Sequence, residues 1–133
     1  MYKIPGWSES LRVGNAQLDD RHRHVIALCS RAARCASTVT REGRSEFHLI
    51  LNDLAALLEQ HFAFEESMLE KNRCPNLTAH KLAHISYLEK MADLLYAAAA
   101  GELNSTALQT FSLSYLNEHL HKMDVADKAY LVA

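Results

Sequence analysis

The stretch LNDLAALLEQHFAFEESMLE, residues 51–70, places two ionisable side chains on the apolar face of a predicted helix. Apolar residues recur at spacings of three and four, which is the period of one face of an α-helix. His61 and Glu65 fall one turn apart on that face. A buried, unpaired carboxylate costs several kcal/mol or takes up a proton, so Glu65 needs a partner. The whole face comprises Leu51, Leu54, Leu58, His61, Glu65, Met68 and Leu69.

The same periodicity predicts four helices, divided by the few glycines and prolines of the chain. We expect an irregular arm over residues 1–17, followed by helices over about 18–40, 46–71 and 77–100 and a last helix from 104 or 105. Ser45 is the expected cap of the second helix, and Gly43 is expected between the first two. Four helices with short connections predict an all-α fold, an up-down-up-down antiparallel four-helix bundle that occupies residues 1–133 as a single domain.

Composition limits the classes of function. With 133 residues, 49% of them hydrophobic and 23% charged, the chain has the composition of a soluble globular protein. The net charge of −2 provides no basic surface for nucleic acid or an anionic membrane. We find no secretion signal and no apolar run long enough to span a bilayer. Three cysteines without a CxxC pair suit a reducing compartment, so we expect a cytoplasmic protein.

Eight histidines are the unusual feature of the composition. At about 100° per residue, helical geometry divides them into two sets. His24, His48 and His121 point away from the apolar faces, whereas the inward set is His22, His61, His80, His84 and His119. A single inward histidine is usually a hydrogen-bonded core residue. Five of them with one glutamate, from all four helices, predict a metal site instead. Imidazole and carboxylate suit iron, zinc or manganese, and five histidines are too many for one tetrahedral zinc ion, so we expect two metal ions.

Four motifs, in this order and spacing, resemble those of the hemerythrin family, in particular its single-domain bacterial members. They are DDRH (19–22), HFAFEE (61–66), HKLAH (80–84) and HLHKMD (119–124). The resemblance covers essentially the whole chain. It implies a hemerythrin-like domain with two iron ions, held in a non-haem di-iron centre with an oxo or hydroxo bridge. The implied ligands are His80, His84 and His119 for one iron, His22 and His61 for the other, and Glu65 and Asp124 as bridges to both.

The place of Asp124 follows from the resemblance and not from helical geometry. Asp124 comes five residues after His119, which is about 140° away on an ideal α-helix. By angle alone it pairs better with His121. A π-bulge, which is common at functional sites, or an approach from the flank would bring it inward. Asp127 is the alternative bridging carboxylate, and Glu66 is expected to face solvent or a neighbouring helix.

The resemblance implies reversible binding of dioxygen by a protein that is not an enzyme: an oxygen carrier, store or delivery protein. Five neutral imidazoles with only two carboxylates form a less anionic shell than that of ferritin-like oxidases, which should favour the diferrous state. Reversible binding also needs a pocket that excludes water. Apolar residues within a turn of the implied ligands could line it: Val25, Ile26, Leu58, Phe62, Leu116 and Leu120. An oxygen-consuming enzyme or a signalling protein would be a further partner.

Two alternatives share part of this pattern. Hemerythrin domains also occur with signalling modules, and an oxygen or redox sensor built from this chain would act through a partner protein. A ferritin-like di-iron oxidase or ferroxidase is suggested by Asp19-x-x-His22 and Glu118-x-x-His121, which have the acid-x-x-His spacing of such enzymes. That alternative leaves the inward histidines of the second and third helices without a role.

Overall fold

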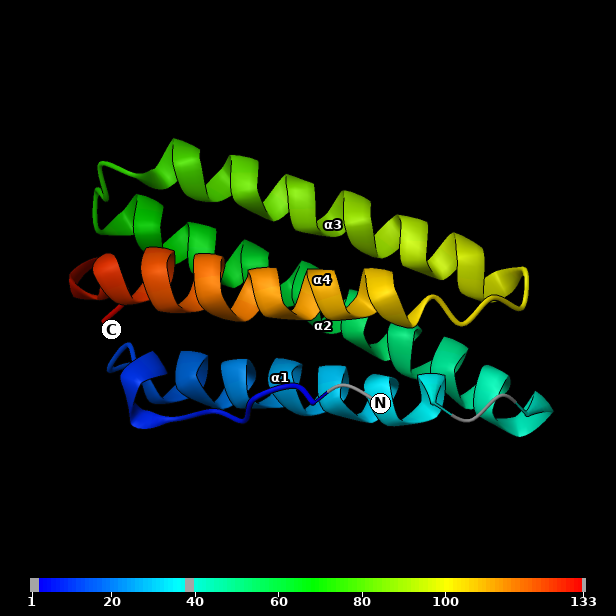
Figure 1. Ribbon diagram of the computed structural model, residues 1–133. Helices are drawn as coiled ribbons and strands as arrows, with labels where there is room; N and C mark the ends of the chain where they lie inside the picture. Colours follow the sequence, from blue (N-terminus) through cyan, green and yellow to red (C-terminus); the bar gives the residue numbers. More distant parts are fainter. Residues whose placement is uncertain (1–2, 38–39, 133) are drawn as a thin grey trace.

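Long helices follow one another along the chain (Figure 1). The computed structural model describes residues 3–37 and 40–132, and these ranges contain no β-strand. The 3-10 helices η1 (Glu9–Leu11) and η3 (Lys128–Tyr130) flank the bundle. The long helices are α1 (Ala16–Ala36), α2 (Arg41–Lys71), α3 (Leu77–Ala99) and α4 (Ser105–Ser114), the last continued by the π-helix η2 (Tyr115–Asp124). The predicted all-α fold is confirmed.

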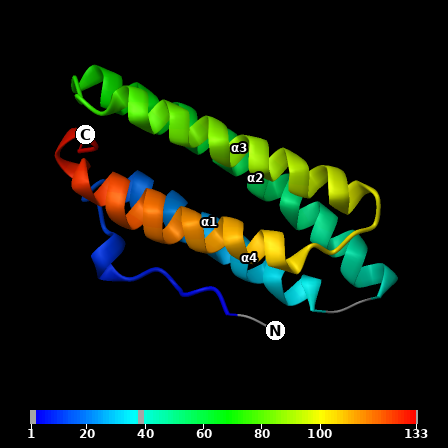
Figure 2. The same ribbon diagram turned by 45° about the horizontal axis from the view of Figure 1, so that its top comes forward.

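The helices form an antiparallel bundle in which each one packs on two neighbours. α1 packs on α2 and α4, and α3 packs on the same two helices. Successive helices run in opposite directions, and the N-terminal arm lies along the outside of the bundle (Figure 2). The up-down-up-down order is therefore as predicted, and it directs one face of every helix towards a common axis.

Asn15 caps helix α1 and ties it to the C-terminal end of the chain. Its side-chain oxygen accepts hydrogen bonds from two backbone N–H groups of the first turn, at 3.0 and 3.1 Å. Its amide donates to the backbone carbonyl of Leu131 at 2.9 Å. The buried Asp19 holds the arm beside it by accepting a hydrogen bond from the N–H of Val13 at 2.9 Å. α1 thus begins at Ala16, slightly before the predicted start.

Replacing Asn15 with alanine should lower the free energy of unfolding by about 1–2 kcal/mol. The variant loses the cap of α1, and it leaves the Leu131 carbonyl without its donor. Denaturant unfolding followed by circular dichroism measures the change. Gln17→Ala, at an exposed position of the same turn, is the control and should change stability by less than about 0.5 kcal/mol. Equal losses in the two variants would contradict the role of the cap.

The predicted junction between the first two helices is wrong. α1 ends at Ala36 and not at residue 40, and α2 begins at Arg41 and not after Ser45. The cap is Thr40, whose side-chain oxygen accepts a hydrogen bond from the N–H of Gly43 at 3.0 Å. Gly43 therefore lies buried in the first turn of α2. Threonine is a good N-cap, and Gly43 supplies the backbone N–H that donates to its side chain.

The predicted end of α3 at Gly101 is confirmed, and its backbone geometry explains it. Gly101 has φ 87°, in the left-handed region that favours glycine. Its N–H bonds the carbonyl of Ala98 at 3.0 Å, and the N–H of Glu102 bonds that of Ala97 at 3.0 Å. This pair of bonds is the Schellman motif, which closes a helix at its C-terminus.

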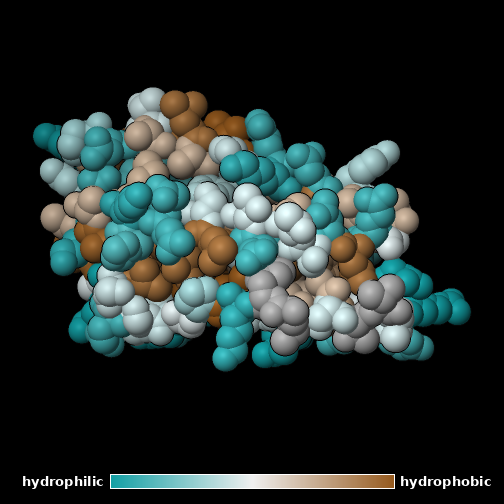
Figure 3. Space-filling model, viewed as in Figure 1, coloured by the Kyte–Doolittle hydropathy of each residue, from teal (hydrophilic) through white to brown (hydrophobic). Residues whose placement is uncertain are grey.

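Apolar side chains from all four helices fill the space between them. Some large ones remain outside: Leu82, Ile85 and Tyr96 are exposed on α3, and Figure 3 shows apolar residues over α3 at the upper edge of the molecule. In the part of the chain that the structure describes, no helix is both long and apolar enough to cross a membrane. One layer of the interior is polar, and it contains the inward histidines.

Candidate metal centre

Seven polar side chains meet in this layer, and each is at most 1% exposed. They come from all four corners of the bundle: His22 from α1, His61 and Glu65 from α2, His80 and His84 from α3, and His119 and Asp124 from η2. The histidines predicted to face outward do not join them, since His24 and His121 are exposed and His48 is half-buried. The helical-angle prediction of the inward set is therefore confirmed as a description of the packing.

The π-helical geometry of η2 brings Asp124 into the layer. In a π-helix the backbone hydrogen bonds span five residues, so side chains five apart lie about one turn apart. His119 and Asp124 are related in this way and share a face. Nε2 of His119 lies 3.4 Å from Oδ1 of Asp124. The local π-helix, one of the two routes considered from the sequence, explains the inward position of the aspartate.

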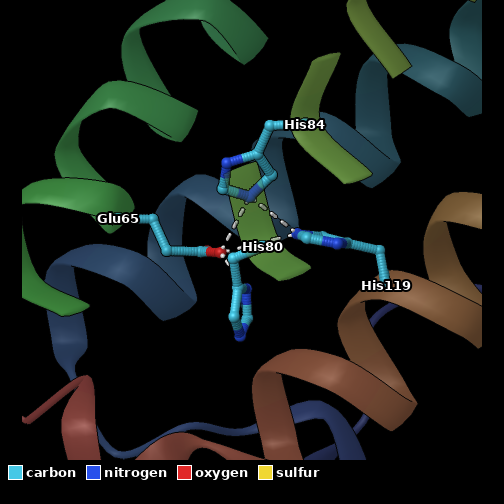
Figure 4. A group of neighbouring side chains, drawn as sticks. All are labelled: Glu65, His80, His84 and His119. Atoms are coloured by element: carbon cyan, nitrogen blue, oxygen red, sulfur yellow. Dashed lines mark hydrogen bonds and ion pairs between the residues drawn. The ribbon is translucent and has the colours of Figure 1, made fainter. Parts of the chain in front are cut away.

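Three histidines surround one oxygen of Glu65, and we call them the three-histidine group (His80, His84 and His119). Oε1 of Glu65 lies 3.1 Å from Nε2 of His84, 3.4 Å from Nδ1 of His80 and 3.5 Å from Nε2 of His119. Figure 4 shows these side chains converging from α2, α3 and η2. One ligand atom from each of the four residues lies within 4.8 Å of the others, a spacing that could hold a metal ion.

The other oxygen of Glu65 faces the two-histidine group, which consists of His22 and His61. Oε2 lies 3.3 Å from Nε2 of His61 and 3.7 Å from Nε2 of His22. Asp124 also faces both groups: its Oδ2 lies 3.5 Å from Nε2 of His22, and its Oδ1 lies 3.6 Å from Nδ1 of His80. Two candidate metal positions therefore lie side by side, with Glu65 and Asp124 between them.

Two further carboxylates support the site from outside. Asp127, the alternative to Asp124, does not lie between the groups; its Oδ2 contacts the outer nitrogen of His80, Nε2, at 2.8 Å. Oε2 of Glu66 lies 2.7 Å from the outer nitrogen of His84, Nδ1. Glu66 contacts a neighbouring helix, as expected, but the supporting role of neither carboxylate was predicted from the sequence. Their positions in the sequence were the available signal: Glu66 directly follows Glu65, and Asp127 comes three residues after Asp124.

The donor atoms of this layer fit a pair of cations. Oε2 of Glu65 and both oxygens of Asp124 are buried and have no hydrogen-bond partner among the described residues. Burial raises the pKa of Asp124 well above its ordinary value, and the charge of Glu65 raises it further. Burial also opposes ionisation of Glu65, but contacts with the surrounding histidines outweigh it and hold the pKa well below the ordinary value. Two metal ions would satisfy these oxygens and offset the repulsion between the two carboxylates.

Burial also affects the pKa values of the imidazoles in this layer. It lowers the pKa of His61 and of His119 and so favours the neutral form, which is the form that binds metal. Burial likewise opposes protonation of His80, but the neighbouring Glu65 and Asp127 outweigh it, and the pKa of His80 is raised. His80 therefore has a carboxylate on each side of its ring: Glu65 faces Nδ1 and Asp127 faces Nε2.

Apolar and aromatic side chains enclose the layer. Phe62 stacks on His84, with ring centroids 4.0 Å apart and planes 6° apart, and Tyr115 stacks on His119 at 5.5 Å and 25°. These contacts fix the planes of two imidazoles. The residues predicted to line an oxygen pocket are all buried in the main core: Val25, Ile26, Leu58, Phe62, Leu116 and Leu120.

Two tyrosines of this enclosure should respond in opposite ways to loss of the hydroxyl. The buried hydroxyl of Tyr115 has no hydrogen-bond partner among the described residues, whereas that of Tyr87 donates to the carbonyl of Ser114 at 3.1 Å. Tyr115→Phe should raise the free energy of unfolding of the metal-free protein by about 1 kcal/mol, and Tyr87→Phe should lower it by a similar amount. Urea unfolding measures both changes. A stabilising Tyr87→Phe or a destabilising Tyr115→Phe would contradict this assignment of hydrogen bonds.

The acid-x-x-His spacings of the ferritin-like alternative do not build a second site. Glu118 and His121 are both exposed, and Glu118 pairs with Lys122 at 3.2 Å. Asp19 is buried but accepts hydrogen bonds from backbone N–H groups of the arm. Of these four acid-x-x-His residues, only His22 belongs to the polar layer, and it does so without its acidic neighbour.

Comparison with known proteins identifies the family of this chain. The family model described as "Hemerythrin HHE cation binding domain" matches residues 13–128, a range that includes every side chain of the polar layer. The chain belongs to the hemerythrin family. The resemblance of its four motifs to hemerythrins is thereby confirmed.

Individual hemerythrins match over most of their length. A bacteriohemerythrin of Stenotrophomonas maltophilia (strain R551-3) is 27% identical over 120 residues, covering 90% of this chain and 76% of the relative. A myohemerythrin of Riftia pachyptila is 29% identical over 133 residues, covering 98% of each chain. A crystal structure of a hemerythrin point mutant superimposes with a TM-score of 0.87 at 25% identity, over 99% of this chain and 100% of the other. The match therefore extends to the whole bundle.

Proposed function

We propose that this hemerythrin-family protein holds two iron ions side by side and binds dioxygen reversibly. One observation carries the proposal: Glu65 and Asp124 each present one oxygen to the three-histidine group and the other to the two-histidine group. A carboxylate in this position can bridge two ions. Imidazole and carboxylate ligands suit iron, and the cation-binding description of the family model supports a metal.

The two proposed iron positions differ in the number of side chains that surround them. Counting both carboxylates, the three-histidine group offers five side chains and the two-histidine group offers four. The ion at His22 and His61 would therefore have more room for an external ligand. When bound, the iron pair supplies the electrons by which dioxygen is held. The protein supplies mostly neutral ligands, which favour the reduced state of the ions and a return to it when oxygen leaves.

Reversible binding also requires that water be kept from the site. The six buried apolar residues around the polar layer, Val25, Ile26, Leu58, Phe62, Leu116 and Leu120, would provide this exclusion. Each side chain of the polar layer is at most 1% exposed, so the ligands present no open surface to an organic substrate. We therefore propose a role in carrying, storing or delivering oxygen without chemical turnover.

Reduction of the purified protein without air, followed by addition and removal of oxygen, tests this function. The expected result is two iron ions per chain and a visible absorption band that appears with oxygen and vanishes under vacuum. Two iron ions that oxidise irreversibly would favour the oxidase or redox-sensor alternatives. A protein that takes up no iron would refute the proposal.

A further inference from the structure

The three-histidine group has two ligand imidazoles supported by carboxylates. The outer nitrogen of His80 lies 2.8 Å from Asp127, and the outer nitrogen of His84 lies 2.7 Å from Glu66. Both distances are short for hydrogen bonds between a ring N–H and a carboxylate, as expected for charge-assisted bonds. Each bond leaves the other ring nitrogen of its histidine directed at Glu65.

The two-histidine group has no such support. The Nε2 atoms of His22 and His61 face each other at 3.0 Å and approach Glu65, so their Nδ1 atoms are the outer ones. Both Nδ1 atoms are buried and have no hydrogen-bond partner in the described ranges. The supporting carboxylates therefore lie on one side of the site only.

Asp127 is held in place by a second contact, and Glu66 is half-buried beside its histidine. Asp127 is 6% exposed, and the side-chain amide of Asn76, at the start of α3, donates to its two oxygens at 3.0 and 3.3 Å. Glu66 follows Glu65 on α2, and its side chain is 28% exposed. The histidines that they support lie one turn apart on α3. One helix thus receives a carboxylate from α2 and another from the C-terminal segment.

We propose that Glu66 and Asp127 lower the reduction potential of the ion in the three-histidine group, so that this ion is the first of the pair to be oxidised. The inference rests on the proposed di-iron centre. A carboxylate that accepts a hydrogen bond from a ligand imidazole raises the basicity of the ligating nitrogen. It also adds a negative charge nearby, and both effects stabilise the ferric ion over the ferrous ion. The ion at His22 and His61 receives neither effect.

The step concerned is a one-electron oxidation of the fully reduced protein. One ferrous ion becomes ferric, and its electron passes to an external one-electron acceptor such as ferricyanide. No covalent bond forms or breaks, and the N–H protons stay on His80 and His84. The asymmetry thus sets the order in which the two ions give up electrons.

Glu66→Gln and Asp127→Asn test the inference, because each removes the negative charge and keeps one oxygen that can accept the hydrogen bond from the histidine. In a redox titration of the iron-loaded protein with mediators under nitrogen, both variants should raise the potential of the first oxidation. We expect each to shift the equilibrium about tenfold towards the ferrous form, which is about 59 mV for one electron. The second oxidation should shift less. Glu70→Gln, an exposed position one turn further along α2, removes the same charge without contacting a ligand and should shift either step less than about threefold.

A second measurement uses the metal-free protein and redox-inert Zn²⁺. Glu66→Ala removes the acceptor as well as the charge and should weaken Zn²⁺ binding by about 10- to 100-fold, while Glu66→Gln should restore most of the affinity. Unchanged Zn²⁺ affinity in Glu66→Ala would overturn the positioning role. Unchanged potentials in Glu66→Gln and Asp127→Asn, or equal shifts of both oxidation steps, would overturn the tuning of one ion. If the parent protein does not bind two iron ions, it is the proposed function that fails.

Discussion

Replacing Glu65 with alanine should lower the iron content from two ions per chain to one at most. Glu65 is the side chain that both histidine groups share, with Oε1 3.1 Å from His84 and Oε2 3.3 Å from His61. Alanine removes a ligand from each proposed ion. It also removes a negative charge that balances the positive charge of the two ions. Iron analysis of the folded variant, loaded without air and freed of excess metal, measures the loss.

Glu118→Ala is the matched control for this experiment. Glu118 is also an acidic residue within a helical segment, but it is exposed and pairs only with Lys122 among the described residues. The variant should keep both iron ions. Retention of two ions by Glu65→Ala, with loss of iron from Glu118→Ala, would instead favour the ferritin-like arrangement of ligands.

Asp124→Asn should make the metal-free protein more stable while it impairs the binding of two metal ions. Burial and the nearby charge of Glu65 raise the pKa of Asp124 well above its ordinary value of 3.8. The folded parent must therefore bind a proton there that the unfolded chain releases above about pH 4. Its free energy of unfolding should fall, relative to that of the variant, as the pH rises from about 4 towards the raised pKa.

The expected slope of that difference is about 1.4 kcal/mol per pH unit within this window. Urea unfolding of parent and variant, both metal-free, at several pH values measures it. A stability difference that does not depend on pH would show that the pKa of Asp124 is not raised in the folded protein. Iron analysis of the same variant shows whether the site has lost an ion.

The sequence was sufficient for the fold and for most of the polar layer, because both follow from helical periodicity. Histidines at the spacing of apolar residues share their face, so the position of His22, His61 and Glu65 inside the bundle could be predicted before the structure. Helix ends were less predictable. Several residue types can cap a helix, and here Thr40 formed the cap in place of Ser45.

The parts that periodicity could not predict depend on departures from the ideal α-helix or on contacts between distant segments. Asp124 faces inward only because η2 is π-helical, and an α-helical spacing directs it elsewhere. Glu66 and Asp127 lie outside the inward faces, and their roles come from hydrogen bonds to α3 across the bundle. Such hydrogen bonds depend on how the helices pack against one another, and the geometry of a single helix does not predict that packing.

Anomalous diffraction at the iron absorption edge, from crystals of the iron-loaded protein, tests the central claim most directly. We expect two iron peaks inside the bundle. One should lie among His80, His84 and His119, the other beside His22 and His61, with the carboxylates of Glu65 and Asp124 between them. A single peak, or iron bound elsewhere on the chain, would contradict the proposed di-iron centre.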